Sequence, residues 1–253
     1  MKSIERKSLL YKTKVEYGDY TINHVQGCAH GCTYPCYAMM LSKRFGRCKN
    51  MDEWCQPRIV SNALELLDKE LKKNSKNIES VQLSFMTDPF MVGYPEVSEL
   101  SVKILDRLNQ DDIKGIILTK GEIPEEALRT SLINEFGITL VSLDEKFRKK
   151  YEQGTIAYAK RIASLYKAHK AGFRTWVSME PYPTPNIVEQ DLERILNEIK
   201  FVDKIIFGRM NYNREVSSYK NYKKFYNKVA EEVIAFCKEN NIEYYIKNGT
   251  ITK

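Results

Sequence analysis

Short apolar segments alternate with amphipathic segments along most of this chain of 253 residues. The segments with strand-like composition begin near residues 20, 81, 115, 138, 174, 203 and 243. After the first one, a helix-like segment lies before each of them. Such alternation predicts parallel strands joined by right-handed helical crossovers. We therefore expect an α/β fold, a partial (β/α)6 barrel of the TIM type with parallel strands in a single domain.

Local patterns place the individual elements. Apolar residues recur at helical spacing from residue 58 to 71, and Pro124 suits the first turn of a helix that ends before Gly137. The nearly continuous apolar run 115–119 is typical of a strand buried on both faces, and the next strand is placed over 138–143. The segment 46–57 has neither pattern, so we expect an irregular excursion there.

The composition favours one domain in a reducing compartment. Apolar residues make up 43% of the chain, enough for a sizeable core, and no linker or repeat divides it. We expect residues 1–18 to form an N-terminal arm on the surface of a domain formed by 19–253. No apolar run approaches the roughly 18 residues of a membrane span, and no secretory signal is apparent. We therefore expect a cytoplasmic protein without membrane contact.

The charge balance leaves the class of partner open. The chain has 40 basic and 33 acidic residues, which gives a net charge of +7. This excess is compatible with an anionic partner such as nucleic acid, and equally with a lysine-rich surface.

Three cysteines lie close together directly after the first strand-like segment, at positions 28, 32 and 36. Three soft sulfur ligands at this spacing suit an iron–sulfur cluster that keeps one iron open to another ligand. A structural zinc site would need a fourth partner. Cys48 and Cys55 are expected to be packing residues, and Cys237 shares an apolar helical stripe and is assigned to the core. With no exporting segment, the six cysteines are expected to be reduced thiols.

Polar residues follow the predicted strands at their carboxyl ends, where the loops of a parallel βα array converge. They are Ser84, Thr87, Asp88, Lys120, Ser142, Asp144, Glu180 and Arg209. Taken singly, each could be structural, as a helix cap, a loop hydroxyl or a solvated charge. Together they offer cations for a carboxylate, carboxylates for an amine and hydroxyls for a ribose, which are the groups that bind an amino-acid nucleoside.

These motifs resemble those of the radical S-adenosylmethionine enzymes, in the branch that includes spore photoproduct lyase. The similar stretches are Gly27-Cys28-Ala29-His30-Gly31-Cys32 with Cys36-Tyr37-Ala38, the stretch 84–88, Leu118-Thr119-Lys120, and Val141-Ser142-Leu143-Asp144-Glu145. The resemblance covers residues 20 to about 180. It implies a partial (β/α)6 barrel that holds a [4Fe–4S] cluster by three cysteines, with S-adenosylmethionine on the free iron.

Residue by residue, the resemblance assigns Cys28, Cys32 and Cys36 to the cluster and packs Tyr37 on the adenine. One electron from the cluster would cleave the sulfonium and leave a 5′-deoxyadenosyl radical that abstracts hydrogen from a substrate. The substrate is not identified by the sequence; nucleic acid or another macromolecule such as a protein is favoured. The resemblance also implies an electron donor such as flavodoxin or ferredoxin.

The same resemblance assigns Lys120 to the methionyl carboxylate and one of Ser84, Thr87 and Asp88 to the amine. The remaining strand-end candidates for contact with S-adenosylmethionine are Ser142 and Asp144, near the ribose, together with Glu180 and Arg209. For a hydrogen-donating side chain the sequence leaves Tyr182, Tyr212 and Cys48 open.

Two departures from the family pattern matter. The family spaces its cysteines by three and then two residues, whereas Thr33-Tyr34-Pro35 separates Cys32 from Cys36 here. A bulged loop stiffened by Pro35 would absorb the extra residue. The photoproduct repair enzymes place a hydrogen-donating cysteine just before the Thr/Ser-Asp pair, and Phe85-Met86 occupy that place, so photoproduct repair is disfavoured.

Two alternatives stay open at this point. One is a non-catalytic zinc-binding module in which the three cysteines and either His30 or a more distant cysteine hold the metal, and the barrel binds an anionic partner. In the leading interpretation His30 instead supports the loop by hydrogen bonding. The other alternative is a radical enzyme that cleaves its cofactor in another direction.

Overall fold

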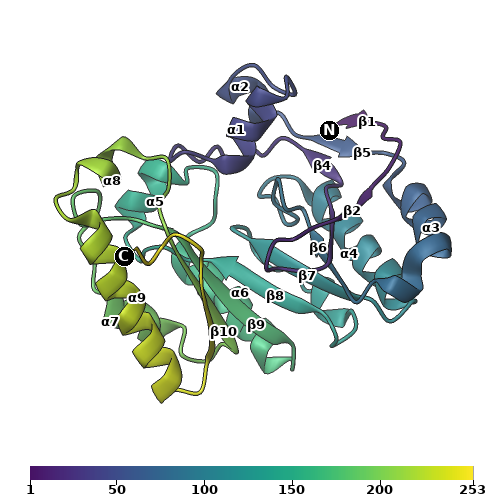
Figure 1. The fold of residues 1–253 in the computed structure, drawn as a ribbon. Coiled ribbons are helices and arrows are strands. Elements are labelled where there is room, and N and C mark those ends of the chain that lie inside the picture. The colour runs from purple at the N-terminus through teal and green to yellow at the C-terminus, as the bar shows by residue number, and fades with distance from the viewer. Residues whose placement is uncertain (253) are drawn as a thin grey trace.

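The computed structural model describes residues 1–252 and has an α/β architecture built on one large sheet (Figure 1). The order of its eight strands is β11 (Glu243–Ile246), β10 (Lys204–Arg209), β9 (Arg174–Tyr182), β8 (Glu135–Thr139), β7 (Lys114–Thr119), β6 (Ser80–Leu83), β3 (Tyr20–Ile22) and β2 (Leu10–Lys12). Every neighbouring pair is parallel except β2 and β3. In the described residues the end strands β2 and β11 do not pair with each other, so this is the predicted partial barrel, left open.

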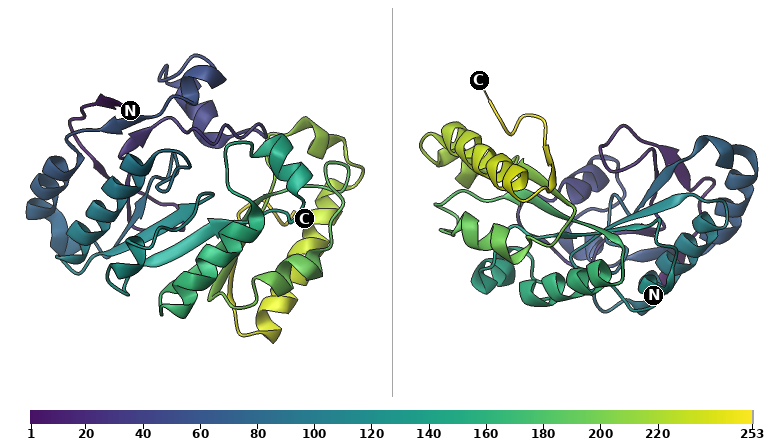
Figure 2. Two further views of the ribbon diagram at one scale, coloured as in Figure 1. Left: turned by 180° about the vertical axis from the view of Figure 1, so that it is seen from behind. Right: turned by 90° about the horizontal axis from the view of Figure 1, so that it is seen from below.

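Helices cover one face of this sheet (Figure 2). They are α3 (Ala63–Asn74), α4 (Pro95–Asn109), α6 (Tyr158–Lys170), α7 (Leu192–Glu198) and α9 (Tyr222–Glu239). Each buries an apolar stripe against the strands, and the main core lies between the two layers. None of the helices in residues 1–252 has the length and apolarity needed to cross a bilayer.

A second, smaller sheet and several short helices lie around the carboxyl ends of the strands (Figure 1). The small sheet consists of β1 (Lys2–Ile4), β5 (Arg58–Val60) and β4 (Val25–Gln26). The short helices there are α1 (Tyr37–Arg44), α2 (Met51–Trp54), α5 (Glu145–Tyr151) and α8 (Arg214–Ser218). The 3-10 turns Ser75–Asn77 and Ala127–Arg129 precede β6 and β8 instead.

The N-terminal segment is part of both sheets. β1 pairs with β5 and β2 pairs with β3, and the connection between β2 and β3 crosses the inner face of the large sheet (Figure 1). There Tyr17 packs with Ile116, Trp176 and Ile206, and its ring stacks on Trp176 with the centroids 5.3 Å apart. This second apolar cluster therefore covers part of the inner face of the sheet.

Two predicted elements are wrong. The strand placed over 138–143 runs from Glu135 to Thr139, and the helix placed before it is reduced to the 3-10 turn Ala127–Arg129. Gly137 had suggested a helix end, but it lies inside the strand. A Cβ atom there would lie 2.3 Å from the ring of Trp176 on β9, so a side chain at 137 has no room in this pair of strands.

The segment after Pro57 was also assigned differently. Arg58–Val60 forms strand β5 between β1 and β4, and the helix begins only at Ala63. Pairing partners that are distant in the sequence override the helical spacing here. The predicted excursion 46–57 contains the one-turn helix α2, which Asn50 caps by accepting a hydrogen bond from the backbone N–H of Glu53 at 2.9 Å.

Candidate functional site

A cavity of about 500 Å³ opens at the carboxyl ends of the strands, within the size range of small-molecule sites. Its wall draws on the segment after β3, on the ends of β6, β7, β9 and β10, and on the N-terminal connection. The predicted site residues in this wall are Cys28, Cys32, Cys36, Tyr37, Ser84, Thr87, Asp88, Lys120, Glu180 and Arg209. The topology therefore brings together ten predicted residues that are spread along most of the chain.

Ser142 and Asp144 do not line this cavity in the described part of the chain. The buried Ser142 hydroxyl accepts a hydrogen bond from the backbone N–H of Asp144 at 3.0 Å. Asp144 in turn caps α5, because its carboxylate accepts from the backbone N–H of Lys146 at 2.6 Å. Both side chains have local partners that stabilise the turn into α5.

Two backbone contacts hold the first part of the cysteine loop, residues 28–36, in place. The N–H of Cys28 donates to the carbonyl of Trp54 at 2.9 Å, and the N–H of Gly154 donates to the carbonyl of His30 at 3.0 Å. A Cβ atom on Gly154 would lie 2.5 Å from the carbonyl oxygen of Ala29. Only glycine allows the segment after α5 to approach the loop this closely.

The residue that lengthens the loop is accommodated by an inward turn. Thr33 donates through its backbone N–H to Tyr151 at 2.9 Å and through its hydroxyl to the Lys150 carbonyl at 2.8 Å. Tyr34 is buried, and its hydroxyl donates to the carboxylate of Glu152 at 3.0 Å. The segment between Cys32 and Cys36 is thus anchored on the end of α5.

A buried ion pair supports this anchor. Glu152 and Arg161 are both 0% exposed, and their charged groups lie 2.7 Å apart. Arg161 also donates to the carbonyl of Thr139 at 2.8 Å, at the end of β8. Burial alone would raise the pKa of Glu152, but the charges of Arg161 and Lys120 lower it. The carboxylate therefore remains ionised and continues to accept the hydrogen bond from Tyr34.

Asp88 connects the loop after β6 to the end of β7. Its carboxylate accepts from the Thr119 hydroxyl at 2.6 Å and from the backbone N–H groups of Lys120 at 2.7 Å and Phe90 at 2.9 Å. The Nδ1 atom of His30 lies 3.4 Å from the same carboxylate. With this many protein partners, Asp88 holds the wall of the cavity in a fixed shape.

His30 supports the cysteine loop by hydrogen bonding, as expected. Its Nε2 accepts from the backbone N–H of Val92 at 3.2 Å, so its Nδ1 carries the proton and faces Asp88. Burial lowers the pKa of His30. Because both ring nitrogens face protein partners, His30 is not available as a metal ligand.

Apart from Glu16, whose carboxylate is paired with Lys247, two polar atoms in the wall have no hydrogen-bond partner among the described residues. They are the Oγ1 atom of Thr87 and the Oε1 atom of Gln82, both buried. Ser84, close to both, has a φ of 57°, a backbone conformation that non-glycine residues rarely adopt. Unpartnered buried oxygen atoms are costly unless a ligand or water satisfies them.

The other predicted residues mark the rim of the cavity. Tyr37, the first residue of α1, is 50% exposed and contacts the ring of Phe85 edge-on at 6.0 Å. Arg209 donates through Nε to Asn211 at 2.7 Å. Of the possible hydrogen donors, Tyr212 lines the cavity and is exposed, whereas Tyr182 and Cys48 do not line it in the described residues.

Sequence reasoning missed a cluster on the far side of the cavity. Lys247 lies 2.9 Å from Glu180 and 2.5 Å from Glu16 of the N-terminal connection, and its ammonium group is over the ring of Tyr17. Burial alone would lower the pKa of Lys247, but Tyr17 and Glu180 raise it. Lys247 directly follows the last strand, so the strand-end rule could have found it; Glu16 and Tyr17 lie in no recognisable motif.

The three cysteines fit an iron–sulfur cluster better than a single metal ion. All three are free thiols that line one cavity. Among residues 1–252 no three His, Cys, Asp or Glu side chains are grouped to hold one metal ion. A single tetrahedral ion needs its sulfur ligands about 2.3 Å from one point, whereas the thiolates of a cluster bind separate corners. Burial raises the pKa of Cys32 to about 12, so this thiol becomes an anion only when a cation replaces its proton.

Comparison with known proteins agrees with this geometry. A family model described as the Radical SAM superfamily matches residues 22–199, which is more than half of the chain. This chain belongs to the radical SAM superfamily. The match confirms the enzyme class expected from the sequence, and the structural matches below confirm the fold. Radical SAM enzymes use S-adenosylmethionine and an iron–sulfur cluster.

Two solved structures share the fold across most of the chain, and one viral protein is similar in sequence. Spore photoproduct lyase, solved with a dinucleoside spore photoproduct, has 14% sequence identity and a TM-score of 0.70, and the match covers 96% of this chain and 80% of that one. The SuiB protein of Streptococcus suis, solved with S-adenosylmethionine, has 14% identity and a TM-score of 0.52 over 72% of this chain and 43% of that one. An uncharacterised protein of Acidianus two-tailed virus, ORF301, is 27% identical over 215 residues, which are 77% of this chain and 68% of that one.

Proposed function

We propose that this protein is a radical SAM enzyme that uses a [4Fe–4S] cluster to cleave S-adenosylmethionine and abstracts a hydrogen atom from a macromolecular substrate, with nucleic acid favoured over protein. The observation that carries the proposal is the shared cavity: three free thiols and two unpartnered polar atoms form one wall. When bound, the reduced cluster would supply the electron that generates a 5′-deoxyadenosyl radical.

In this proposal Cys28, Cys32 and Cys36 hold the cluster through three of its irons. The buried contacts of Tyr34 and His30 fix the loop before any metal binds, so little ordering entropy remains to be lost on binding. The extra residue between Cys32 and Cys36 is thereby compatible with cluster binding, because Tyr34 turns into the core instead of displacing Cys36.

S-adenosylmethionine would be bound by groups that already face the cavity. Lys120 supplies a cation for its carboxylate. The unpartnered hydroxyl of Thr87 and the amide oxygen of Gln82 can accept hydrogen bonds from its amine or ribose. Tyr37, at the rim, offers an aromatic face for the adenine.

The same proposal gives Asp88, Ser142 and Asp144 a supporting role. Asp88 is satisfied by protein donors, Asp144 caps α5, and Ser142 accepts from the backbone N–H of Asp144. We therefore propose that they hold the loops around the cofactor. Ser84, Glu180 and Arg209 remain candidates for direct contact.

The substrate and partner proposals rest on chemistry. The net charge of +7 is compatible with an anionic substrate, and the spore photoproduct lyase structure that shares the fold contains a dinucleoside. Photoproduct repair is not proposed, since within residues 1–252 only the three cluster cysteines line the cavity.

A flavodoxin or ferredoxin would supply the electron. We also propose a cytoplasmic location, because all six cysteines are free thiols.

Anaerobic purification tests the cluster directly. We expect a brown protein with broad absorbance near ~400 nm and about four irons per chain, as thiolate-bound clusters of this kind give. Replacing Cys28, Cys32 or Cys36 with Ala removes a ligand and is expected to abolish iron binding. A colourless protein that retains zinc would contradict the proposal and support the zinc-binding alternative.

Cys237→Ala is the matched control. Cys237 lies on the buried face of α9 and does not line the cavity. We expect normal iron content and a lower free energy of unfolding by about 1 to 3 kcal/mol, the usual range for a small cavity in the core. Equal loss of iron in this variant would mean that iron content reports folding alone.

A further inference from the structure

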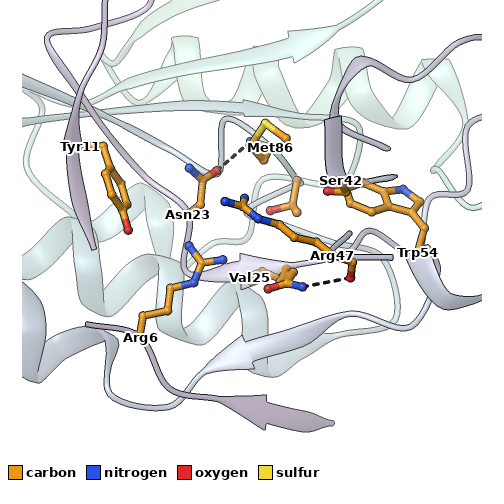
Figure 3. A pocket seen from close by; sticks show the side chains of 11 residues that line it. Arg6, Tyr11, Asn23, Val25, Ser42, Arg47, Trp54 and Met86 are labelled. Atoms are coloured by element: carbon orange, nitrogen blue, oxygen red, sulfur yellow. Dashed lines mark hydrogen bonds between the residues drawn. The ribbon is translucent and has the colours of Figure 1, made fainter. Parts of the chain in front are cut away.

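The cavity that the three cysteines line is called the radical cavity below. A second cavity, of about 230 Å³, lies beside it (Figure 3). Its wall comes from the N-terminal strands, from β4 and the segment after it, and from the loop after β6. Figure 3 shows the guanidinium groups of Arg6 and Arg47 pointing into the same space, next to Asn23. The predicted function assigns no role to either arginine.

No carboxylate lines this second cavity in the described part of the chain. Arg6 and Arg47 form none of the ion pairs found among residues 1–252. Burial lowers the pKa of Arg6; Tyr11 in the same wall raises it, and the charge of Arg47 lowers it. Two guanidinium groups held close together without a counter-charge repel each other, and a bound anion would relieve that repulsion.

Further donors converge on the same space. The Oδ1 atom of Asn23 accepts from the backbone N–H of Met86 at 2.8 Å, which leaves the amide N–H₂ group for the cavity. Thr87 lines both cavities, and its hydroxyl has no partner among the described residues. Because a hydroxyl both accepts and donates, it can accept from S-adenosylmethionine as proposed above and donate its own proton to an anion in the second cavity. Two planar guanidinium forks with an amide and a hydroxyl make a set of donors with the geometry and charge that phosphate requires.

The two cavities share a wall. Trp54, Met86 and Thr87 line both of them. A phosphate held by the arginines would therefore lie just behind the place where the proposed radical is formed. This arrangement suits a substrate that is anchored by its phosphate and reacts at a neighbouring group.

We infer that Arg6, Arg47, Asn23 and Thr87 form a phosphate-binding site that anchors the substrate next to the radical cavity. The ligand is a phosphate group, which either a nucleic-acid backbone or a small phosphorylated molecule can supply. The anchoring role rests on the proposed function, whereas the phosphate site itself does not.

Binding assays on the full chain without S-adenosylmethionine test the site. The probes are inorganic phosphate, followed by calorimetry, and a fluorescein-labelled single-stranded DNA of twelve nucleotides, followed by anisotropy. Arg6→Gln and Arg47→Gln are each expected to weaken phosphate binding about tenfold, the loss of one charge-assisted hydrogen bond. If the backbone of nucleic acid is the source, the double variant also weakens DNA binding and lowers the salt slope of log Kd by about one.

Arg129→Gln is the matched control. Arg129 is exposed in the 3-10 turn that precedes β8, at the opposite end of the sheet. It removes one positive charge without touching the site, so binding is expected to be unchanged. Neither test variant should unfold the chain: Arg47 is exposed, and Arg6 is held through its backbone by Asn62. Melting temperatures check this.

Each outcome decides the inference. If the arginine variants weaken both probes, the site accepts a phosphodiester; if they weaken inorganic phosphate alone, it accepts a phosphomonoester. If both variants bind like the parent, or if Arg129→Gln loses as much affinity, the site is rejected. Phosphate binding is measured without S-adenosylmethionine, and formation of 5′-deoxyadenosine is measured separately on the parent protein, so failure of this inference is distinguishable from failure of the proposed function.

Discussion

At the scale of single residues, the site is built from polar groups that the protein itself buries and satisfies. His30 and Asp88 hold the loops together through hydrogen bonds to backbone N–H groups. Tyr34 extends the cysteine loop and anchors it on Glu152. These contacts could not be predicted from the sequence, because each joins residues that lie far apart along the chain. What the residue pattern did predict is the identity of the ten side chains that share the cavity.

His24 makes stability depend on pH. It is fully buried, with Nε2 2.7 Å from the Ser101 hydroxyl, and burial lowers its pKa to about 3. In the unfolded chain its pKa is about 6.5, so between these values the unfolded state binds the extra proton. The stabilisation is complete above pH 6.5 and is lost as the pH falls towards 3.

We therefore expect the free energy of unfolding in urea to fall by about 2 kcal/mol between pH 7 and pH 5 through this group alone. In His24→Gln an amide that does not titrate in this range replaces the imidazole, so the stability of the variant should change less over the same interval. If the pH profiles of the parent and the variant are parallel, His24 has the same pKa in the folded and the unfolded protein, and the expectation is wrong.

At the scale of elements, the sequence predicted the seven parallel strands of the large sheet and most of the long helices, although it placed β8 at 138–143 instead of Glu135–Thr139. In these elements the local spacing of apolar residues indicates which positions are buried, so the elements can be recognised from the sequence. The errors fall where a distant partner decides. Gly137 lies within β8 because Trp176 covers it, and residues 58–60 form a strand because β1 and β4 flank them. The short helices α5 and α8 have too few turns for a clear apolar stripe.

The close contact between the segment after α5 and the cysteine loop gives a test at this scale. Gly154→Ala would place a Cβ atom 2.5 Å from the Ala29 carbonyl. We expect the loop to shift, and the iron content of the anaerobically purified protein to fall to less than about half of the parent value. Gly18→Ala is the control, since the nearest atom would lie 3.4 Å from its Cβ. Full iron content in Gly154→Ala would refute a positioning role for this contact.

At the scale of the whole molecule, an open barrel has to fill its own floor. The N-terminal connection does this by placing Tyr17 against Trp176 on the inner face. Lys247 then joins the connection and β9 by pairing with Glu16 and Glu180. The sequence suggested only a surface arm, because an inserted loop has no periodic pattern. Long-range packing alone decides where it lies.

Tyr17→Ala tests the role of this insertion. Removing the ring leaves a cavity between the connection and the sheet, and we expect a loss of about 3 to 5 kcal/mol in the free energy of unfolding. Tyr17→Phe keeps the stacked ring and should cost about 1 kcal/mol or less. Urea unfolding of both variants measures the difference. If Tyr17→Ala were as stable as Tyr17→Phe, the connection would not be part of the fold's core.

The central claim is that a cluster held by the three cysteines cleaves S-adenosylmethionine bound at the carboxyl ends of the strands. The most direct measurement is chromatography of the products after anaerobic incubation of the dithionite-reduced protein with S-adenosylmethionine. We predict 5′-deoxyadenosine from the parent and none from Cys32→Ala. Methylthioadenosine in its place, or no cleavage product from a protein with full iron content, would contradict the claim.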